Sequence, residues 1–503
     1  MSATACSLAT PLLFHSLRNT VALLAEAQAH SSCPLALRCT GTRLPDFWKM
    51  LFLTGLPRAT KAIILATAIF VTVLAALQFR SDHGVLSHGT MTGTTFAGQP
   101  HAHTVDNQSQ LPCQALKGGD DVLVVMRTGA TEVKDKLPVH LNTTFRCYKH
   151  LAIFSDYAES FEGYQIHDVL ADMPEDIKTT HDDFSHYQHI LQVGRENLAA
   201  SELSGKVSLE SGPVGKNDNA GWRLDKWKFL PMLNATQEMY PHMNWYVFVE
   251  PDTYVVWSNL LQWLATMDPS KPAYFGSEVM IGDDIFAHGG SAFVLSSAAL
   301  KVGADSYRRH TRDLWDFTGG HWAGDCVLGV ALHDAGVDLT WSWPMFQGGN
   351  PSLMHWTEDK GDDRRLWCLP CLSYHHLNPD GKRRLFEFEQ EWIRNGSGPL
   401  LHHRDTYKAY VRPQLESEKQ DWSNFPETTW TEMEFSECRE HCERNATCIQ
   451  YAVDADGRCA TGTQFRLGQA QPGVHSGWIV ERVDAWSAKL DEYCPSQNSW
   501  TVP

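Results

Sequence analysis

The stretch Trp245-Tyr-Val-Phe-Val-Glu-Pro-Asp-Thr-Tyr254 is the most informative part of this sequence. Its apolar and aromatic first half predicts a short strand buried on both faces. Glu250 and Asp252 follow, separated by a proline that restricts its neighbour to an extended backbone. In open α/β sheets, ligands bind at the carboxyl ends of the strands, and two carboxylates there suit a divalent cation. Capping of a helix that begins near Ser258, or closing of the turn, is an equally good explanation of Asp252.

The composition is that of a globular protein with more than one folded part. The chain has 503 residues, of which 43% are hydrophobic and 20% charged, so we expect one large domain with additions. The formal net charge of −17 argues against a nucleic-acid partner. The 18 tryptophans are suited to stacking on sugar rings, but large cores also contain tryptophan.

An uncharged apolar run, 62–79, predicts a membrane-spanning helix over 61–80. Lys61 and Arg58 precede this run, and a basic excess on that side places the preceding tail, 1–60, in the cytoplasm. A cleaved signal peptide is the alternative, but the run begins far from the N-terminus and lacks a clear small-residue cleavage site. The polar residues 81–112 are typical of a flexible stem.

Glycosylation sequons and cysteines support a lumenal location for the rest of the chain. All the sequons lie beyond the apolar run, at Asn107, Asn142, Asn234, Asn395 and Asn445. Of the 13 cysteines, all but Cys6, Cys33 and Cys39 also lie beyond it, and their even number is compatible with disulfides. We therefore expect a single-pass type II protein of the Golgi or ER membrane.

The main domain is expected over 113–412, with an α/β fold. Apolar runs at 121–126 and 150–154 predict two strands of a Rossmann-like βαβ unit. Cys113 and Cys147 flank this unit, where a bridge is possible, although sequence alone does not establish the connectivity. Asp156 follows the second strand and is placed either to contact a ribose or base, or simply to form a turn. A helix is predicted to open over 221–233, and the apolar stripe from Leu260 to Met267 predicts a second one that packs in the core.

The block from Trp245 to Leu300 resembles the inverting glycosyltransferase family 31, especially core 1 β1,3-galactosyltransferases and Fringe-like enzymes of fungal type. The resemblance rests on WYVFVEPDTYVVWSNLLQWL, then DPSKPAYFGS at 268–277 and HGGSAFVLSSAAL at 288–300. It extends less tightly over 121–376. The family usually has three consecutive aspartates where this chain has Glu250-Pro251-Asp252.

The resemblance implies a GT-A fold, a UDP-sugar donor, Mn²⁺ or Mg²⁺ as the metal, and a glycan or glycoprotein acceptor. It implies metal ligation by Asp252 with Glu250, and by His375, which lies in a Ser-Tyr-His sequence similar to the family's Ser-Phe-His; His376 is the alternative. The donor contacts that we expect are Arg127, Thr128, Asp156, Lys226, Glu250, Gly289 and Gly290. The two glycines have a simpler explanation as a tight turn before a strand.

Asp325 is the expected catalytic base. It lies in Gly324-Asp-Cys-Val-Leu-Gly329, which resembles the family's Glu-Asp-x-x-x-Gly motif with glycine in place of glutamate. Inversion requires one base, which takes the proton of the attacking hydroxyl. Asp325 is also well suited to the N-cap of a helix over 326–335, and the two roles are compatible.

Cysteine spacing gives two further expectations. Cys368-Leu-Pro-Cys371 before a His pair is compatible with zinc, but in a secreted setting disulfide chemistry is favoured. After a linker over 413–430, the cysteines of 431–495 resemble those of a PAN/Apple module. That resemblance implies the pairs Cys438–Cys459 and Cys442–Cys448, leaves Cys494 unassigned, and implies binding of protein or carbohydrate. A purely structural appendage is equally compatible.

Three functions are compatible with these features. The first is a metal-dependent transferase that moves galactose or an N-acetylhexosamine onto a hydroxyl, with a β1,3 linkage. The second is a catalytically inactive carbohydrate-binding membrane protein on the same scaffold. The third is a membrane-anchored adhesion or scaffold protein. The sequence identifies neither the sugar nor the oligomeric state.

Overall fold

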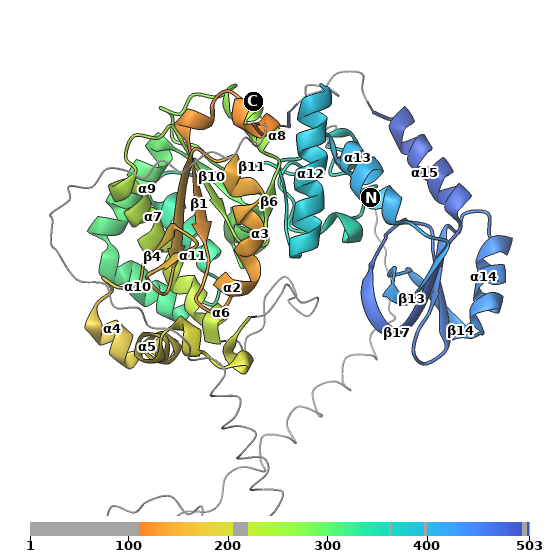
Figure 1. Ribbon diagram of the computed structural model, residues 1–503, viewed down its shortest axis with the longest axis horizontal. Coiled ribbons are helices and arrows are strands. Elements are labelled where there is room, and N and C mark those ends of the chain that lie inside the picture. Colours follow the sequence, from red (N-terminus) through yellow and green to blue (C-terminus); the bar gives the residue numbers. More distant parts are fainter. Residues whose placement is uncertain (1–109, 205–219, 362–363, 397–399, 495–499, 502–503) are drawn as a thin grey trace, which may run out of the picture. The chain divides into compact units, whose positions relative to one another are not determined.

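The computed structural model describes residues 110–204, 220–361, 364–396, 400–494 and 500–501, which form a mixed α/β protein (Figure 1). Its largest sheet has the strand order β11-β7-β10-β5-β1-β2-β4-β3. The bounds are β1 Val122–Arg127, β2 His150–Ser155, β3 Glu159–Phe161, β4 Tyr164–Asp168, β5 Trp245–Val249, β7 Tyr274–Gly276, β10 Phe293–Ser296 and β11 Leu339–Trp341. β3 pairs antiparallel with β4, and β10 with both β5 and β7; the other neighbours are parallel. The expected α/β class and the predicted strand over 245–249 are confirmed.

The central strands β1, β5 and β10 are buried on both faces, as their continuous apolar runs predict. Val124 and Val247 belong to one hydrophobic cluster, whereas Leu123 and Tyr246 belong to a second one on the opposite face. This alternation is the period-two geometry of a strand. Side chains of α8 (Trp257–Leu264) and α12 (Pro379–Asn395) complete the first cluster, and those of α7 (Phe229–Met239), α9 (Ser297–Arg309) and α11 (Gly324–Asp334) complete the second.

Shorter elements fill the connections. They are α2 Val133–Lys136, α3 Pro138–Leu141, α4 Glu175–Thr180, α5 Phe184–Val193, α6 Ala220–Asp225, α10 Thr311–Gly320, α13 His403–Thr406, the pair β6 Tyr254–Val255 and β12 Ser373–Tyr374, and the hairpin β8 Glu278–Ile281 with β9 Asp284–Ala287. The helix predicted over 221–233 is interrupted, because the 3₁₀ turn Lys226–Lys228 separates α6 from α7. That turn directs the Lys228 side chain inward, onto Asp156.

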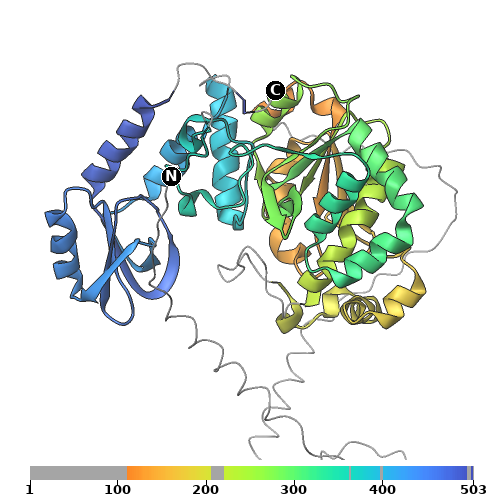
Figure 2. The ribbon, with the colours of Figure 1, turned by 180° about the vertical axis from the view of Figure 1, so that it is seen from behind.

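A second, antiparallel sheet lies toward the C-terminus (Figure 2). Its order is β13-β17-β15-β16-β14, with bounds β13 Glu418–Ser423, β14 Thr428–Glu432, β15 Gln450–Val453, β16 Arg458–Gly462 and β17 Gln469–Trp478. Two helices accompany it, α14 Phe435–Arg444 and α15 Val480–Glu492. The prediction of a linker over 413–430 is wrong, because this segment contains β13 and the start of β14. The residues of β13 show no strand pattern in the sequence, because most of their side chains are exposed and the strand is held by backbone pairing with β17.

Disulfides hold both parts of the chain. Three of them are the expected pairs, Cys113–Cys147, Cys438–Cys459 and Cys442–Cys448. The fourth joins Cys368 to Cys494, whereas Cys371 is a buried free thiol. The Cys-x-x-Cys sequence is therefore neither a local disulfide nor a pair of thiolates for zinc.

The predicted tail 1–60, membrane span 61–80 and nearly all of the stem lie outside the described residues, as does Asn107. No helix in the described part of the chain is long and apolar enough to cross a membrane. The side chains of Asn142, Asn395 and Asn445 are exposed. Asn234 is half-buried, and its amide bonds with Glu238 and Arg308.

Candidate metal and nucleotide-sugar site

The pairing of two short strands builds the candidate metal site. β6 follows the acid-bearing turn, and β12 pairs with it antiparallel, with Tyr374 opposite Tyr254. His375 comes directly after β12, so this register places it beside Asp252. The backbone N–H of Leu377 donates to the Asp252 carbonyl at 3.0 Å and fixes the two segments together.

Asp252, His375 and His376 each offer a ligand atom, and these atoms lie within 4.8 Å of one another. Asp252 and His375 are 5% and 4% exposed, and His376 is half-buried. Asp252 Oδ1 lies 3.2 Å from His375 Nε2, yet neither atom makes a hydrogen bond of acceptable geometry. Buried polar atoms without hydrogen bonds are rare. One carboxylate and one or two imidazoles are a donor set that divalent transition metals accept, so the residues fit a metal ion.

The electrostatics of the pair favour a cation at this point. Burial opposes charge on both groups, but Lys136 and His375 hold the pKa of Asp252 well below its usual value. Burial likewise opposes protonation of His375, but Asp252 and Glu250 raise its pKa to about 9. Burial and the neighbouring His375 lower the pKa of His376 to about 4. Positive charge is thus stabilised between the carboxylates and His375, and a metal ion would replace a proton there.

Two lysines lie against the acid-bearing turn. Lys136 of α2 contacts Asp252 Oδ2 at 3.3 Å and Glu132 at 2.8 Å. Lys382 of α12 is buried and donates to the carbonyl of Pro251, which also lies 2.7 Å from His140 Nε2. Burial lowers the pKa of Lys382 to about 8. These cations partly offset the charge of the acids, and nothing in their local sequence identifies them in advance.

Glu250 has a different setting from Asp252. Its carboxylate pairs with Arg127, which also pairs with Asp225 and lies 4.1 Å above the Phe229 ring. Glu250 Oε2 still lies 3.6 Å from His375 Nε2. Burial opposes ionisation of Glu250, but Arg127 outweighs it and holds the pKa well below its usual value. Glu250 is therefore an ionised neighbour of the cluster, already bound to a guanidinium.

The two glycines of the 288–300 block admit neighbouring side chains. A Cβ at Gly290 would lie 2.1 Å from His375 Cε1, so the imidazole occupies the space that a side chain would need. A Cβ at Gly289 would lie 3.2 Å from Phe229 and 3.4 Å from Asp325. The expected reason for the glycines was close approach of backbone to the donor sugar; the contact found at Gly290 is with a candidate metal ligand.

Asp325 lies in the first turn of α11 and is partly exposed. Its Oδ2 accepts from the Gly289 N–H at 2.9 Å, and Oδ1 lies 3.0 Å from the N–H of Cys326. The N-cap of α11 is Ala323, so Asp325 does not have the capping position that was its alternative explanation. The hydrogen bond to Gly289 ties Asp325 to the loop that also contacts His375.

Asp252 does not cap α8 either. The carboxylate of Glu389, from α12, accepts from the Ser258 N–H and hydroxyl, each at 2.7 Å. The capping explanation of Asp252 is therefore wrong, because a residue far away in the sequence supplies that carboxylate.

Three other expected donor contacts already have partners within the protein. Asp156 is 1% exposed; its carboxylate lies 2.8 Å from Lys228 Nζ and accepts from the Ala130 N–H at 2.7 Å. Lys228 also donates to the carbonyl of Thr128. Asp156 and Thr128 thus shape the loop after β1 from within. Lys226 pairs with Asp183 at 2.9 Å.

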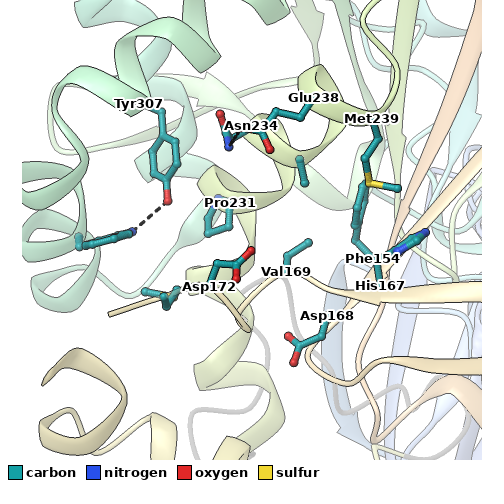
Figure 3. A pocket seen from close by; sticks show the side chains of 13 residues that line it. Phe154, His167, Asp168, Val169, Asp172, Pro231, Asn234, Glu238, Met239 and Tyr307 are labelled. Atoms are coloured by element: carbon teal, nitrogen blue, oxygen red, sulfur yellow. Dashed lines mark hydrogen bonds between the residues drawn. The ribbon is translucent and has the colours of Figure 1, made fainter. Parts of the chain in front are cut away.

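A pocket of about 270 Å³ lies elsewhere in the main domain (Figure 3). Phe154, Asp168, Asp172 and the sequon residue Asn234 contribute to its lining, and the Trp315 Nε1–H donates to the Tyr307 hydroxyl at 3.2 Å. None of the expected metal, donor or base residues lines it, so it does not belong to the candidate site.

Sequence reasoning therefore selected Asp252, His375, Glu250 and Asp325, which the structure brings together, and it missed Lys136, Lys382, His140 and Asp225. A search against models of known protein families found no match.

Proposed function

We propose that this chain is a membrane-anchored, metal-dependent inverting glycosyltransferase with a GT-A catalytic domain similar to family 31 and a C-terminal PAN/Apple-like module. It moves galactose or an N-acetylhexosamine from a UDP-sugar to a hydroxyl of a glycan or glycoprotein acceptor, with a β1,3 linkage. Its location is the Golgi or ER membrane, with the catalytic domain in the lumen. The observation that carries the proposal is the cluster of Asp252, His375 and His376 at the carboxyl end of β5.

The residues divide the chemistry between them. Asp252 and His375, with His376, would hold Mn²⁺ or Mg²⁺. When bound, the ion offsets the negative charge that develops on the leaving diphosphate. Lys136, which already contacts Asp252, adds a fixed positive charge on the same side.

Asp325 receives the proton of the acceptor hydroxyl. At the same time the hydroxyl oxygen bonds to the anomeric carbon of the donor sugar, and the bond between that carbon and the diphosphate oxygen breaks. The Gly289 N–H donates to the Asp325 carboxylate and so orients it. Gly289 belongs to the loop that contacts His375. One base and no protein nucleophile are sufficient for inversion.

The test is to supply the purified full-length chain with Mn²⁺ and a panel of UDP-sugars, and to measure UDP release with and without glycan acceptors. At least one donor is expected to be consumed, and Asp252→Asn is expected to abolish the release. Asp120→Asn, which removes an exposed carboxylate in the turn before β1, at the opposite end of that strand from Arg127, is the matched control and should retain full activity. Activity that survives in Asp252→Asn would overturn the metal assignment.

A second function is favoured by one observation. Lys136 pairs with Asp252, and Arg127 with Glu250, so both acids already have a protein cation. Such a site is also suited to binding a nucleotide-sugar or glycan without turnover. Saturable binding of UDP-sugar, with no UDP release under Mn²⁺, Mg²⁺ or Co²⁺, would favour this carbohydrate-binding function over catalysis.

A further inference from the structure

An aromatic surface lies next to the candidate base. Trp222 and Trp322 have ring centroids 6.3 Å apart with an interplanar angle of 26°. His321 stacks on Trp322 at 6.2 Å and 11°, and Phe317 approaches His321 at 5.6 Å. Trp322 is 47% exposed and Phe317 36%. We call Trp222, Phe317, His321 and Trp322 the aromatic platform.

The platform is built from the elements that carry the candidate site. Trp322 lies three residues before Asp325, at the entrance to α11. Trp222 belongs to α6, whose Asp225 pairs with Arg127 and thereby connects to Glu250.

Gly324 explains why the two tryptophans meet. A Cβ at this position would lie 2.4 Å from Phe229 Cδ2 and 2.6 Å from the Lys226 Cα, so α11 packs directly on the turn after α6. The glutamate that family 31 usually has here would not fit. The chain's departure from the family motif is thus the feature that permits this close approach.

Hydrogen bonds hold the platform loop in place. Lys226 Nζ donates to the His321 carbonyl at 2.9 Å, and the Ala323 N–H donates to His321 Nδ1 at 3.0 Å. Large aromatic side chains that are held rigidly and exposed are costly to leave in water, and they mark sites of interaction. Trp rings bind partners with little loss of conformational entropy.

We infer that the aromatic platform binds a pyranose ring of the acceptor and presents one of its hydroxyls to Asp325. The inference rests on the proposed function. A pyranose has an apolar C–H face, which buries against an indole face, and hydroxyl edges that remain in contact with water. An occupant of this size and polarity suits a small, partly polar platform beside a carboxylate better than a large apolar partner does.

The experiment measures sugar binding directly. The full-length chain is titrated with methyl glycosides of galactose, N-acetylgalactosamine, glucose, N-acetylglucosamine and mannose, and binding is followed by ligand-observed NMR. At least one glycoside is expected to bind through the C–H protons of one ring face. Trp322→Ala and Trp222→Ala should each weaken this binding about tenfold, and Trp322→Phe should restore most of it.

The control is Leu191→Ala, because Leu191 is an exposed apolar residue of α5 that lies outside the aromatic platform. It should leave glycoside binding unchanged. In acceptor-dependent turnover, Trp322→Ala should raise the acceptor KM about tenfold and change the donor KM less than twofold.

Each contrary outcome is distinct. The inference is overturned if no glycoside binds the wild type, if binding is equal in Trp322→Ala, or if that variant alters the sedimentation coefficient and so identifies a second copy as the occupant. Donor consumption with binding that is independent of Trp322 would retain the proposed function and reject the platform. Trp322-dependent binding without consumption of any donor would retain the platform and reject the proposed function.

Discussion

Replacing Gly290 by alanine tests the geometry of the metal site without removing any candidate ligand. The added Cβ would lie 2.1 Å from His375 Cε1 and 2.5 Å from Nε2, whereas ordinary contact begins at 3.4 Å. The imidazole, or the loop that carries Gly290, must therefore move by more than 1 Å. His375 is buried, so it has little free space in which to relax.

A displacement of about 1 Å in a catalytic constellation costs on the order of 100-fold in rate, which corresponds to about 2.7 kcal/mol of transition-state stabilisation. Overpacking costs a further 1–3 kcal/mol or so of folding stability. We therefore expect Gly290→Ala to fold with a reduced Tm, to bind Mn²⁺ roughly 10- to 100-fold more weakly by calorimetry, and to release UDP about 100-fold more slowly.

The matched control is Gly349→Ala. The Gly349 carbonyl accepts from the His375 N–H, so this residue also touches the site, yet a Cβ there would meet nothing within 4 Å. This variant should bind Mn²⁺ and turn over like the wild type. Wild-type Mn²⁺ affinity and UDP release in Gly290→Ala would refute the assignment of His375 as a ligand.

Three further predictions concern stability. Arg127→Met leaves Glu250 and Asp225 without their buried partner and should lower the free energy of unfolding by about 3–5 kcal/mol in urea. Arg312→Met, which breaks the exposed pair with Asp176, should have no resolvable effect. Equal losses in the two variants would contradict this reasoning. Burial opposes ionisation of Asp156, but Lys228 outweighs it and holds the pKa of Asp156 below the usual value. The ion pair therefore stabilises the fold above the unfolded pKa of about 3.9, and this contribution is lost as the pH falls through the folded pKa. The stability difference between wild type and Asp156→Asn should shrink below about pH 4 in acid-unfolding curves, and a constant difference would exclude the ion pair as its source. Cys368 and Cys494 are 126 residues apart in sequence, whereas Cys442 and Cys448 are only 6 apart. If disulfides act through chain entropy, replacing both cysteines of the long-range pair by serine should lower the free energy of unfolding by about 5 kcal/mol, against about 2 kcal/mol for the short-range pair. The reverse order in denaturant unfolding would exclude chain entropy as the cause.

The sequence was sufficient for the elements whose own residue pattern shows which of their faces are buried. The apolar runs 121–126, 150–154 and 245–249 are strands β1, β2 and β5, and the stripe from Leu260 contributes to the core cluster. Such patterns report which face of an element is buried, because side chains alternate along a strand and recur along a helix. They do not report which distant element supplies the partner.

The residues that the sequence did not reveal depend on non-local pairing. Lys136 meets Asp252 across 116 residues, and Glu389 caps α8 from 131 residues away. The register of β6 against β12 brings His375 to Asp252, and a one-residue slip would turn its side chain to the other face. Resemblance to family 31 selected His375, but no local pattern specified that register.

The most direct test of the metal site is pulsed EPR of the full-length chain with Mn²⁺ and UDP. We predict hyperfine coupling from directly bound imidazole nitrogen in the wild type and in Gly349→Ala, and a spectrum of His375→Ala from which the contribution of His375 is absent. A Mn²⁺ spectrum without nitrogen coupling, or one that is unchanged in His375→Ala, would contradict the proposal that Asp252 and His375 together hold the metal.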